Sequence, residues 1–227
     1  RFFELGMDAR MHARRTLELD LRKALVHGEF ELHYQPLVDL ERSEVTAFEA
    51  LLRWNHPQRG RGSPADFIPL AEETGLIVAI GEWVLRQACA DAATWPDHVK
   101  VAVNLSPVQF KTNALVRAVF SALTASGLAP GRLELEITET VLLQNSEATL
   151  VMLHQLRGLG ARVSMDDFGT GYSSLSYLRS FPFDKIKIDQ SFIRDMADNN
   201  QSLAIIQAVT TLGATLGMAT TAEGVET

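Results

Sequence analysis

Two adjacent aspartates, Asp166 and Asp167, are the residues of this chain that most clearly suggest chemistry. The apolar segment Ala161–Met165 precedes them, and a short polar loop containing Gly169 and Gly171 follows. Neighbouring carboxylates at the end of a buried strand repel each other and resist desolvation. A divalent cation such as Mg²⁺ or Mn²⁺ prefers oxygen ligands and would compensate for both effects. The pair therefore indicates a metal site, and a helix-capping aspartate beside a surface aspartate is the alternative.

Other polar residues occur in similar settings, in or just after apolar strand-like segments. Together with the aspartate pair they supply six carboxylates and one amide: Glu49, Asn104, Glu136, Asp166, Asp167, Asp189 and Glu223. An oxygen-rich set of this kind suits one or two Mg²⁺ or Mn²⁺ ions. Two such ions about 3.5–4 Å apart can clamp a phosphodiester. The spacing thus points to metal-dependent phosphoester chemistry.

Two basic residues have candidate roles beside these carboxylates. Lys187 lies two residues before Asp189, so both side chains share one face of a strand. There the lysine could hold an attacking water or neutralise a transition state, and a surface lysine at a strand end is the alternative. Arg53 could pair with a phosphate, and a structural ion pair is its alternative.

Composition limits the remaining classes of function. The 227 residues carry a formal net charge of −7, which argues against DNA or RNA as partners, because those usually require a basic face. The single cysteine, Cys89, forms no intrachain disulfide, which suits a reducing cytoplasm. No apolar run approaches the roughly 20 residues of a membrane span. We therefore expect a cytoplasmic domain with one large core.

The hydrophobic pattern predicts the elements that position these residues. An amphipathic helix is expected over 7–28, where Leu17, Leu21 and Leu25 recur every four residues. Strands over 30–38 and 45–54 are joined by a short turn and are expected to pair antiparallel. A loop rich in Pro, Gly and Arg follows. Helices are then predicted at 65–72, 76–94, 108–126, 147–159, 175–179, up to 195 and 201–212, and strands at 99–105, 132–138, 161–165, 185–189 and 218–222.

Alternation of strands and helices after Pro96 indicates a parallel sheet. A (β/α)₈ barrel, with about 30 residues per unit and its active site at the carboxyl ends of the strands, fits the spacing of the polar residues. The competing fold is an open doubly wound sheet, which usually carries a Gly-rich phosphate loop after its first strand. Such a loop is absent from this sequence, so the barrel is favoured.

At this point the sequence resembles the EAL domain phosphodiesterases, which hydrolyse cyclic diguanylate (c-di-GMP). The signature tripeptide is Glu49-Ala50-Leu51. Further matching blocks run in family order: YQP at 34–36, FIPLAEETGLI at 67–77, VNLSPVQF at 103–110, ELEITE at 134–139, DDFGTGYSS at 166–174, KIDQSF at 187–192 and AEGVET at 222–227. Each block alone is weak, but together they are highly specific.

The resemblance implies a TIM-like barrel with an antiparallel first strand, and it implies roles for individual residues. One Mg²⁺ or Mn²⁺ would be held by Glu49, Asn104, Glu136 and Asp166. Asp166 would bridge to a second ion bound also by Asp167, with Glu223 near it as ligand or base. Lys187 and Asp189 would position the water.

The same resemblance implies substrate contacts and a link to dimerisation. Gln35 and Arg53 match positions that contact c-di-GMP, and the product would be linear pGpG. Glu139 and Glu226 match glutamates beside the DDFGTGYSS loop, which couples the site to a homodimer. Residues 1–28 would be a lead-in helix from an upstream GGDEF-like or sensory module, and residues 29–227 the EAL domain.

The sequence departs from the family in one respect. Family members continue past AEGVET with a last strand and a final helix, including a site glutamine, and this chain has neither. We therefore expect an open or partner-completed sheet edge and impaired catalysis. The alternative functions are a catalytically silent c-di-GMP receptor and a Mg²⁺-dependent barrel that uses Lys187 as a base for proton abstraction. No metal ligand is lost from the sequence, which favours the phosphodiesterase.

Overall fold

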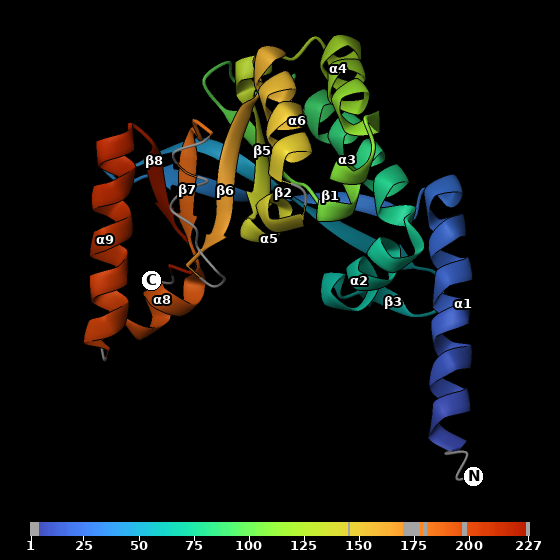
Figure 1. The fold of residues 1–227 in the computed structure, drawn as a ribbon. Coiled ribbons are helices and arrows are strands. Elements are labelled where there is room, and N and C mark those ends of the chain that lie inside the picture. Colours follow the sequence, from blue (N-terminus) through green and yellow to red (C-terminus); the bar gives the residue numbers. More distant parts are fainter. Residues whose placement is uncertain (1–4, 145, 170–177, 179–180, 197–198, 226–227) are drawn as a thin grey trace.

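The structure is a computed structural model that describes residues 5–144, 146–169, 178, 181–196 and 199–225 (Figure 1). Its centre is one strongly curled sheet with the strand order β1-β2-β4-β5-β6-β7-β8, and β3 pairs with β2. The strands are β1 Phe30–Asp39, β2 Glu44–His56, β3 Gly60–Gly62, β4 Lys100–Asn104, β5 Leu133–Thr138, β6 Arg162–Phe168, β7 Lys185–Ile188 and β8 Ala219–Ala222.

The first two strands pair antiparallel, and the pairs from β2 to β8 along the main path are parallel. This confirms the TIM-like fold with an antiparallel first strand. In the described part of the chain the sheet is open, since its order ends at β1 on one side and at β8 on the other. The carboxyl ends of β2, β4, β5, β6, β7 and β8 therefore face one common mouth.

Helices cover the outer face of the curled sheet (Figure 1). The helical elements are α1 Leu5–His27, α2 Pro64–Thr74, α3 Leu76–Ala92, η1 Pro107–Lys111, α4 Ala114–Ser126, η2 Pro130–Arg132, α5 Glu139–Gln144, α6 Ser146–Gly158, α8 Gln190–Asp195 and α9 Asn200–Leu216. Leu133, Leu135 and Ile137 of β5 are buried in the hydrophobic core, while the alternate residues of that strand, Glu134 and Glu136, face the inside of the curl.

The carboxyl-terminal half of α1 is packed against α2, α3 and the end of β2. Leu21 and Ala24 are fully buried, and Asp20 pairs with His56 of β2 at 3.1 Å. The amino-terminal half extends away from the rest of the molecule (Figure 1). Among the described residues, no helix is long and apolar enough to cross a membrane.

Three local predictions were wrong. The segment predicted as a loop contains β3, because residues 60–62 pair back onto residues 54–56. The helix predicted over 108–126 is split into η1 and α4, since Thr112 is extended (φ −138°, ψ 153°) and interrupts the apolar stripe. The short helix α5 was not predicted, because six residues carry too little periodicity. The helix predicted at 175–179 lies almost entirely outside the described residues.

Candidate metal centre

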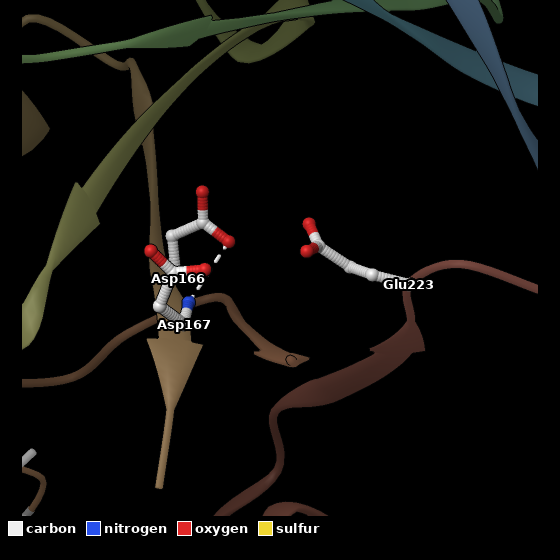
Figure 2. A group of neighbouring side chains, drawn as sticks. All are labelled: Asp166, Asp167 and Glu223. Atoms are coloured by element: carbon white, nitrogen blue, oxygen red, sulfur yellow. Dashed lines mark hydrogen bonds between the residues drawn. The ribbon is translucent and has the colours of Figure 1, made fainter. Parts of the chain in front are cut away.

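The two adjacent aspartates lie at an irregularity in β6. Pairing with β7 shifts register between Met165 and Phe168, and Asp167 adopts a positive φ of 53°. In a regular strand, adjacent side chains point to opposite faces. A bulge with one residue in the left-handed region, which aspartate tolerates better than most residues, re-aims a side chain. Figure 2 shows the carboxylates of Asp166 and Asp167 together with that of Glu223, which follows β8.

These three carboxylates form a compact group. One oxygen from each of Asp166, Asp167 and Glu223 lies within 4.8 Å of the others. Asp166 is buried, whereas Asp167 and Glu223 are half-buried and reach the mouth. The main-chain amide of Asp167 donates a hydrogen bond to Asp166 Oδ1 at 3.0 Å, which fixes the first carboxylate relative to the bulge. The arrangement offers several oxygen ligands to one cation.

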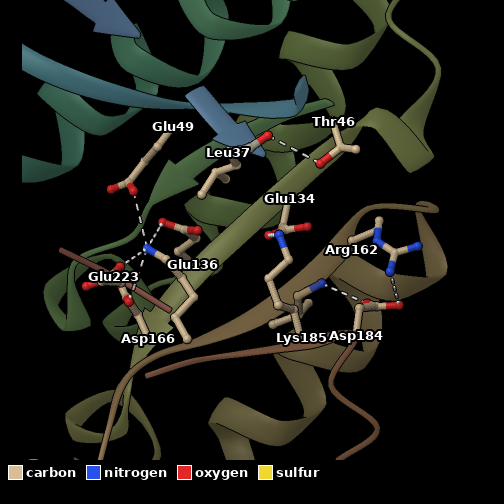
Figure 3. Close-up of polar contacts among 12 residues, drawn as sticks. Leu37, Thr46, Glu49, Glu134, Glu136, Arg162, Asp166, Asp184, Lys185 and Glu223 are labelled. Atoms are coloured by element: carbon tan, nitrogen blue, oxygen red, sulfur yellow. Dashed lines mark hydrogen bonds and ion pairs between the residues drawn. The ribbon is translucent and has the colours of Figure 1, made fainter. Parts of the chain in front are cut away.

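Lys187 of β7 lies at the centre of a larger cluster, and its side chain is 1% exposed. Its Nζ lies 2.6 Å from Glu223 Oε1 and 2.9 Å from Glu136 Oε2. The same ammonium lies 3.2 Å from Asp166 Oδ1 and 3.3 Å from Glu49 Oε2. Figure 3 shows these four carboxylates, from four different strands or strand ends, directed at one point. The carboxylates at the strand ends therefore meet at one place, as expected.

Asn104, the last residue of β4, completes this cluster. Its Nδ2 donates a hydrogen bond to Glu49 Oε1 at 2.7 Å. The amide nitrogen is thus directed at a carboxylate, which leaves the side-chain Oδ1 as a possible cation ligand. The structure brings together all five residues expected to hold metal: Glu49, Asn104, Glu136, Asp166 and Asp167.

The carboxylates of the cluster repel one another, and the pKa values of several are raised. Burial raises the pKa of Glu136 to about 8, and the neighbouring Glu49 and Asp166 add to this effect against the opposing Lys187. Burial also raises the pKa of Asp167 and that of Glu223, and Asp166 contributes in both cases. Burial by itself lowers the pKa of Lys187, but the surrounding carboxylates outweigh it and raise that pKa. Lys187 is therefore held protonated, which disfavours the alternative in which it acts as a base.

One specific observation indicates that these residues fit a divalent cation. Glu136 Oε1 is fully buried and has no hydrogen-bond partner among the described residues. An orphaned buried carboxylate oxygen is costly unless a cation or water contacts it. In addition, four carboxylates pair with a single ammonium and Asp167 adds a fifth carboxylate to the group, so the cluster has an excess of negative charge that one or two Mg²⁺ or Mn²⁺ ions would neutralise.

The two expected substrate contacts lie on the strands around this cluster. Gln35 of β1 is opposite Glu49 in the antiparallel register and is exposed. Arg53 is four residues after Glu49 on β2, on the same face and about 13 Å farther toward the carboxyl end. One guanidinium nitrogen of Arg53 donates to the main-chain oxygen of Leu52 at 2.9 Å, so other donors remain for a ligand.

Two other expected site residues, Asp189 and Glu139, lie outside the cluster around Lys187. Asp189 caps α8, where its Oδ1 accepts hydrogen bonds from the amide and the hydroxyl of Ser191. Glu139 begins α5, and its Oε1 accepts a hydrogen bond from the amide of Gly169 at 3.0 Å, next to the loop it was expected to stabilise. Glu226, together with most of the DDFGTGYSS loop, lies outside the described residues. The roles of these residues stay predictions.

Sequence reasoning missed a second ionic layer inside the curl. Glu134, which is 1% exposed, pairs with Lys185, and Arg162 pairs with Asp184 at 3.6 Å (Figure 3). Glu134 and Lys185 lie two residues before Glu136 and Lys187 on the same strands, so they share the inner face. The alternating patterns ELE and KIK contained this signal.

The chain is similar in sequence to proteins named for c-di-GMP turnover. The chain is 47% identical over 230 residues to the bifunctional diguanylate cyclase/cyclic di-GMP phosphodiesterase MucR of Pseudomonas aeruginosa, a match that covers 100% of this chain and 34% of MucR. It is 43% identical over 230 residues to the cyclic di-GMP phosphodiesterase NbdA of the same organism, covering 100% of this chain and 29% of NbdA. The chain thus spans about a third of the length of these curated relatives.

A solved structure extends the comparison to the fold. The PaMucR phosphodiesterase, in its c-di-GMP complex, superimposes with a TM-score of 0.89 at 47% identity and covers 93% of this chain and 87% of that one. The family match itself runs over residues 18–227, and so includes the packed half of α1 and every residue of the metal centre. By this match, and by its relation to c-di-GMP phosphodiesterases, the chain belongs to the EAL domain family.

Proposed function

We propose that this chain is a metal-dependent phosphodiesterase domain that hydrolyses c-di-GMP to linear pGpG. The observation that carries the proposal is the convergence of Glu49, Glu136, Asp166 and Glu223 on one point, with an orphaned oxygen on Glu136. The names of MucR and NbdA, and the c-di-GMP complex of PaMucR, supply the substrate.

Each group of residues has a distinct part in this function. Glu49, Asn104, Glu136 and Asp166 would hold one Mg²⁺ or Mn²⁺, and Asp166, Asp167 and Glu223 a second. Once bound, such ions supply positive charge to a phosphodiester and lower the pKa of a water. The protonated Lys187 would keep the carboxylates oriented and, together with Asp189, would position the reacting water.

The remaining residues would bind and orient the substrate. Gln35 offers an amide beside Glu49, and Arg53 offers a planar set of donors that suits a phosphate or the edge of a guanine. Asp189, at the start of α8, lies close enough to act on the charge of Asp167 and would help to position the water. Glu139 would hold Gly169, and through it the loop that follows the two aspartates.

Further domains and a homodimer belong to the same proposal. The chain covers 34% of MucR, whose name includes a diguanylate cyclase activity, so a longer parent with an upstream GGDEF or sensory module is expected. The half of α1 that extends away from the sheet would connect to that module (Figure 1).

The test is hydrolysis of c-di-GMP by the chain with and without Mn²⁺. Glu49→Ala should lower kcat/KM at least about a hundredfold, since it removes a ligand of the cluster. The matched control Glu44→Ala changes an exposed glutamate on the same strand and should leave turnover unchanged. Normal turnover in Glu49→Ala would contradict the ligand assignment. Tight binding of c-di-GMP without hydrolysis by the wild type would favour the receptor function instead.

A further inference from the structure

The chain immediately after Asn104 is held by several polar contacts. Leu105 donates its amide to the main-chain oxygen of Glu136 at 2.9 Å, which extends the pairing of β4 with β5. The chain then turns sharply at Ser106 into η1. Asn104 itself is exposed and ends a strand of only five residues, so its position depends on how this turn is fixed.

The hydroxyl of Ser106 makes two hydrogen bonds. Its Oγ donates to Glu72 Oε1 of α2 at 2.7 Å and accepts from the amide of Val108 at 3.2 Å. A hydroxyl has one donor, and here that donor is committed to a carboxylate, which makes the bond stronger than one between neutral groups. The turn after β4 is thus attached to a helix more than 30 residues earlier in the chain.

Gln109 fixes the same turn from the other side. Its Oε1 accepts the amide hydrogen of Ser106 at 2.9 Å, and the side chain is 4% exposed. The amide group lies directly over Gly81 of α3, where an added Cβ would be 2.3 Å from Gln109 Nε2. Only glycine leaves room for this arrangement, because Gln109 is enclosed and its oxygen is already bonded.

We infer that Glu72, Ser106 and Gln109 are positioning residues that hold Asn104 against Glu49 and so set the affinity of the site for divalent cations. The inference rests on the proposed function, because it takes Asn104 as a metal ligand. It adds residues from α2 and η1, none of which touches the cluster. Removing the hydroxyl of Ser106 or the carboxylate of Glu72 would let the turn relax, and the Oδ1 of Asn104 would lose its fixed direction.

The experiment measures Mn²⁺ binding by calorimetry on the full chain, in the absence of any nucleotide. Ser106→Ala and Glu72→Ala should each raise the Kd for Mn²⁺ about tenfold, as loss of a residue that orients a ligand does. Glu72→Gln keeps an acceptor for the serine hydroxyl and should stay within about twofold of the wild type. Gly81→Ala should resemble Ser106→Ala, because it displaces Gln109.

Ser126→Ala is the matched control. Ser126 ends α4 and its hydroxyl also makes hydrogen bonds to the main chain, donating to Ala122 and accepting from Leu128, far along the chain from Asn104. Both serine variants should lower the melting temperature slightly, but only Ser106→Ala should change the Kd. If Ser106→Ala fails to fold, the Kd values of Glu72→Ala and Glu72→Gln for Mn²⁺ test the same inference.

Two outcomes would overturn the inference. One is an unchanged Kd in both Ser106→Ala and Glu72→Ala, and the other is an equal rise in Kd in Ser126→Ala. A wild-type chain that binds Mn²⁺ but does not hydrolyse c-di-GMP would instead contradict the proposed function, and the Kd comparison would still decide the role of Ser106.

Discussion

Two ionic layers inside the curled sheet are made of the same residue types on the same strands. In the first layer, Glu134 of β5 pairs with Lys185 of β7 (Figure 3). In the second, two residues farther along the same strands, Glu136 pairs with Lys187. The first layer has no excess of carboxylates, since Arg162 and Arg157 both pair with Asp184 and Lys100 lies close enough to interact with Glu134. In the second, Lys187 faces four carboxylates, and one oxygen of Glu136 has no partner among the described residues.

The difference shows what separates a structural ion pair from a cation site. A buried pair with matched charges needs nothing further, although it contributes little net stability. A buried group with excess carboxylates is unfavourable until a cation binds, because each carboxylate raises the pKa of its neighbours. An excess of carboxylates over cations, rather than the presence of Glu and Lys, therefore distinguishes the second layer from the first.

Turnover should differ most between variants of the two layers. Glu136→Gln should lower kcat for c-di-GMP at least about a hundredfold, because the orphaned oxygen and the charge of a metal ligand are lost. Glu134→Gln makes the same chemical change one layer away and should retain turnover in the fraction of protein that is folded. Equal losses in the two variants, measured with Mn²⁺ present, would mean that the layers do not differ in function.

The free energy of unfolding should change in the opposite order, with the larger loss in Glu134→Gln. Glu134→Gln leaves Lys185 without its carboxylate in a largely buried setting, so the free energy of unfolding should fall by about 2 kcal/mol. Glu136→Gln removes one of several crowded carboxylates and should leave the metal-free protein as stable as the wild type, or slightly more so. Urea unfolding in the presence of a chelator measures both. A larger loss in Glu136→Gln would contradict the interpretation of the mouth as charge-crowded.

The pH dependence of the free energy of unfolding should also distinguish the two layers. The pKa of Glu136 is raised to about 8 in the folded chain, so the folded state binds a proton there that the unfolded state releases near its ordinary value. Its contribution to stability is present at low pH and is lost as pH rises toward about 8. Without metal, the wild type should thus lose about 1–3 kcal/mol of stability between roughly pH 5 and pH 8.

Glu136→Gln should reduce this loss of stability without abolishing it, since the raised pKa values of Asp167 and Glu223 act in the same direction, and Glu134→Gln should keep the wild-type slope. Thermal unfolding of the three proteins in chelator at several pH values makes the measurement. A wild-type profile that rises over this interval, or one that Glu136→Gln does not alter, would be evidence against the proposed coupling among the carboxylates.

Much of the fold was predictable because local patterns and connectivity agree. The alternation of β5, with Leu133, Leu135 and Ile137 on one face, and the short turn between β1 and β2 each have one reasonable structural solution. The strand ends then had to meet at one mouth, which brought Glu49, Asn104 and Glu136 together as expected. The short elements β3 and α5 were missed because their local signals are weak.

Residue types and their order along the chain show which side chains could bind a cation and the order in which the strands present them. The folded structure is needed to see that four carboxylates surround Lys187, that Lys185 pairs with Glu134 among the described residues, and that Asp189 caps a helix. It also decided that a bulge, with Asp167 in the left-handed region, puts adjacent aspartates on one site. The physical reason is that charge balance and side-chain direction arise from contacts between strands more than 20 residues apart, which no local pattern encodes.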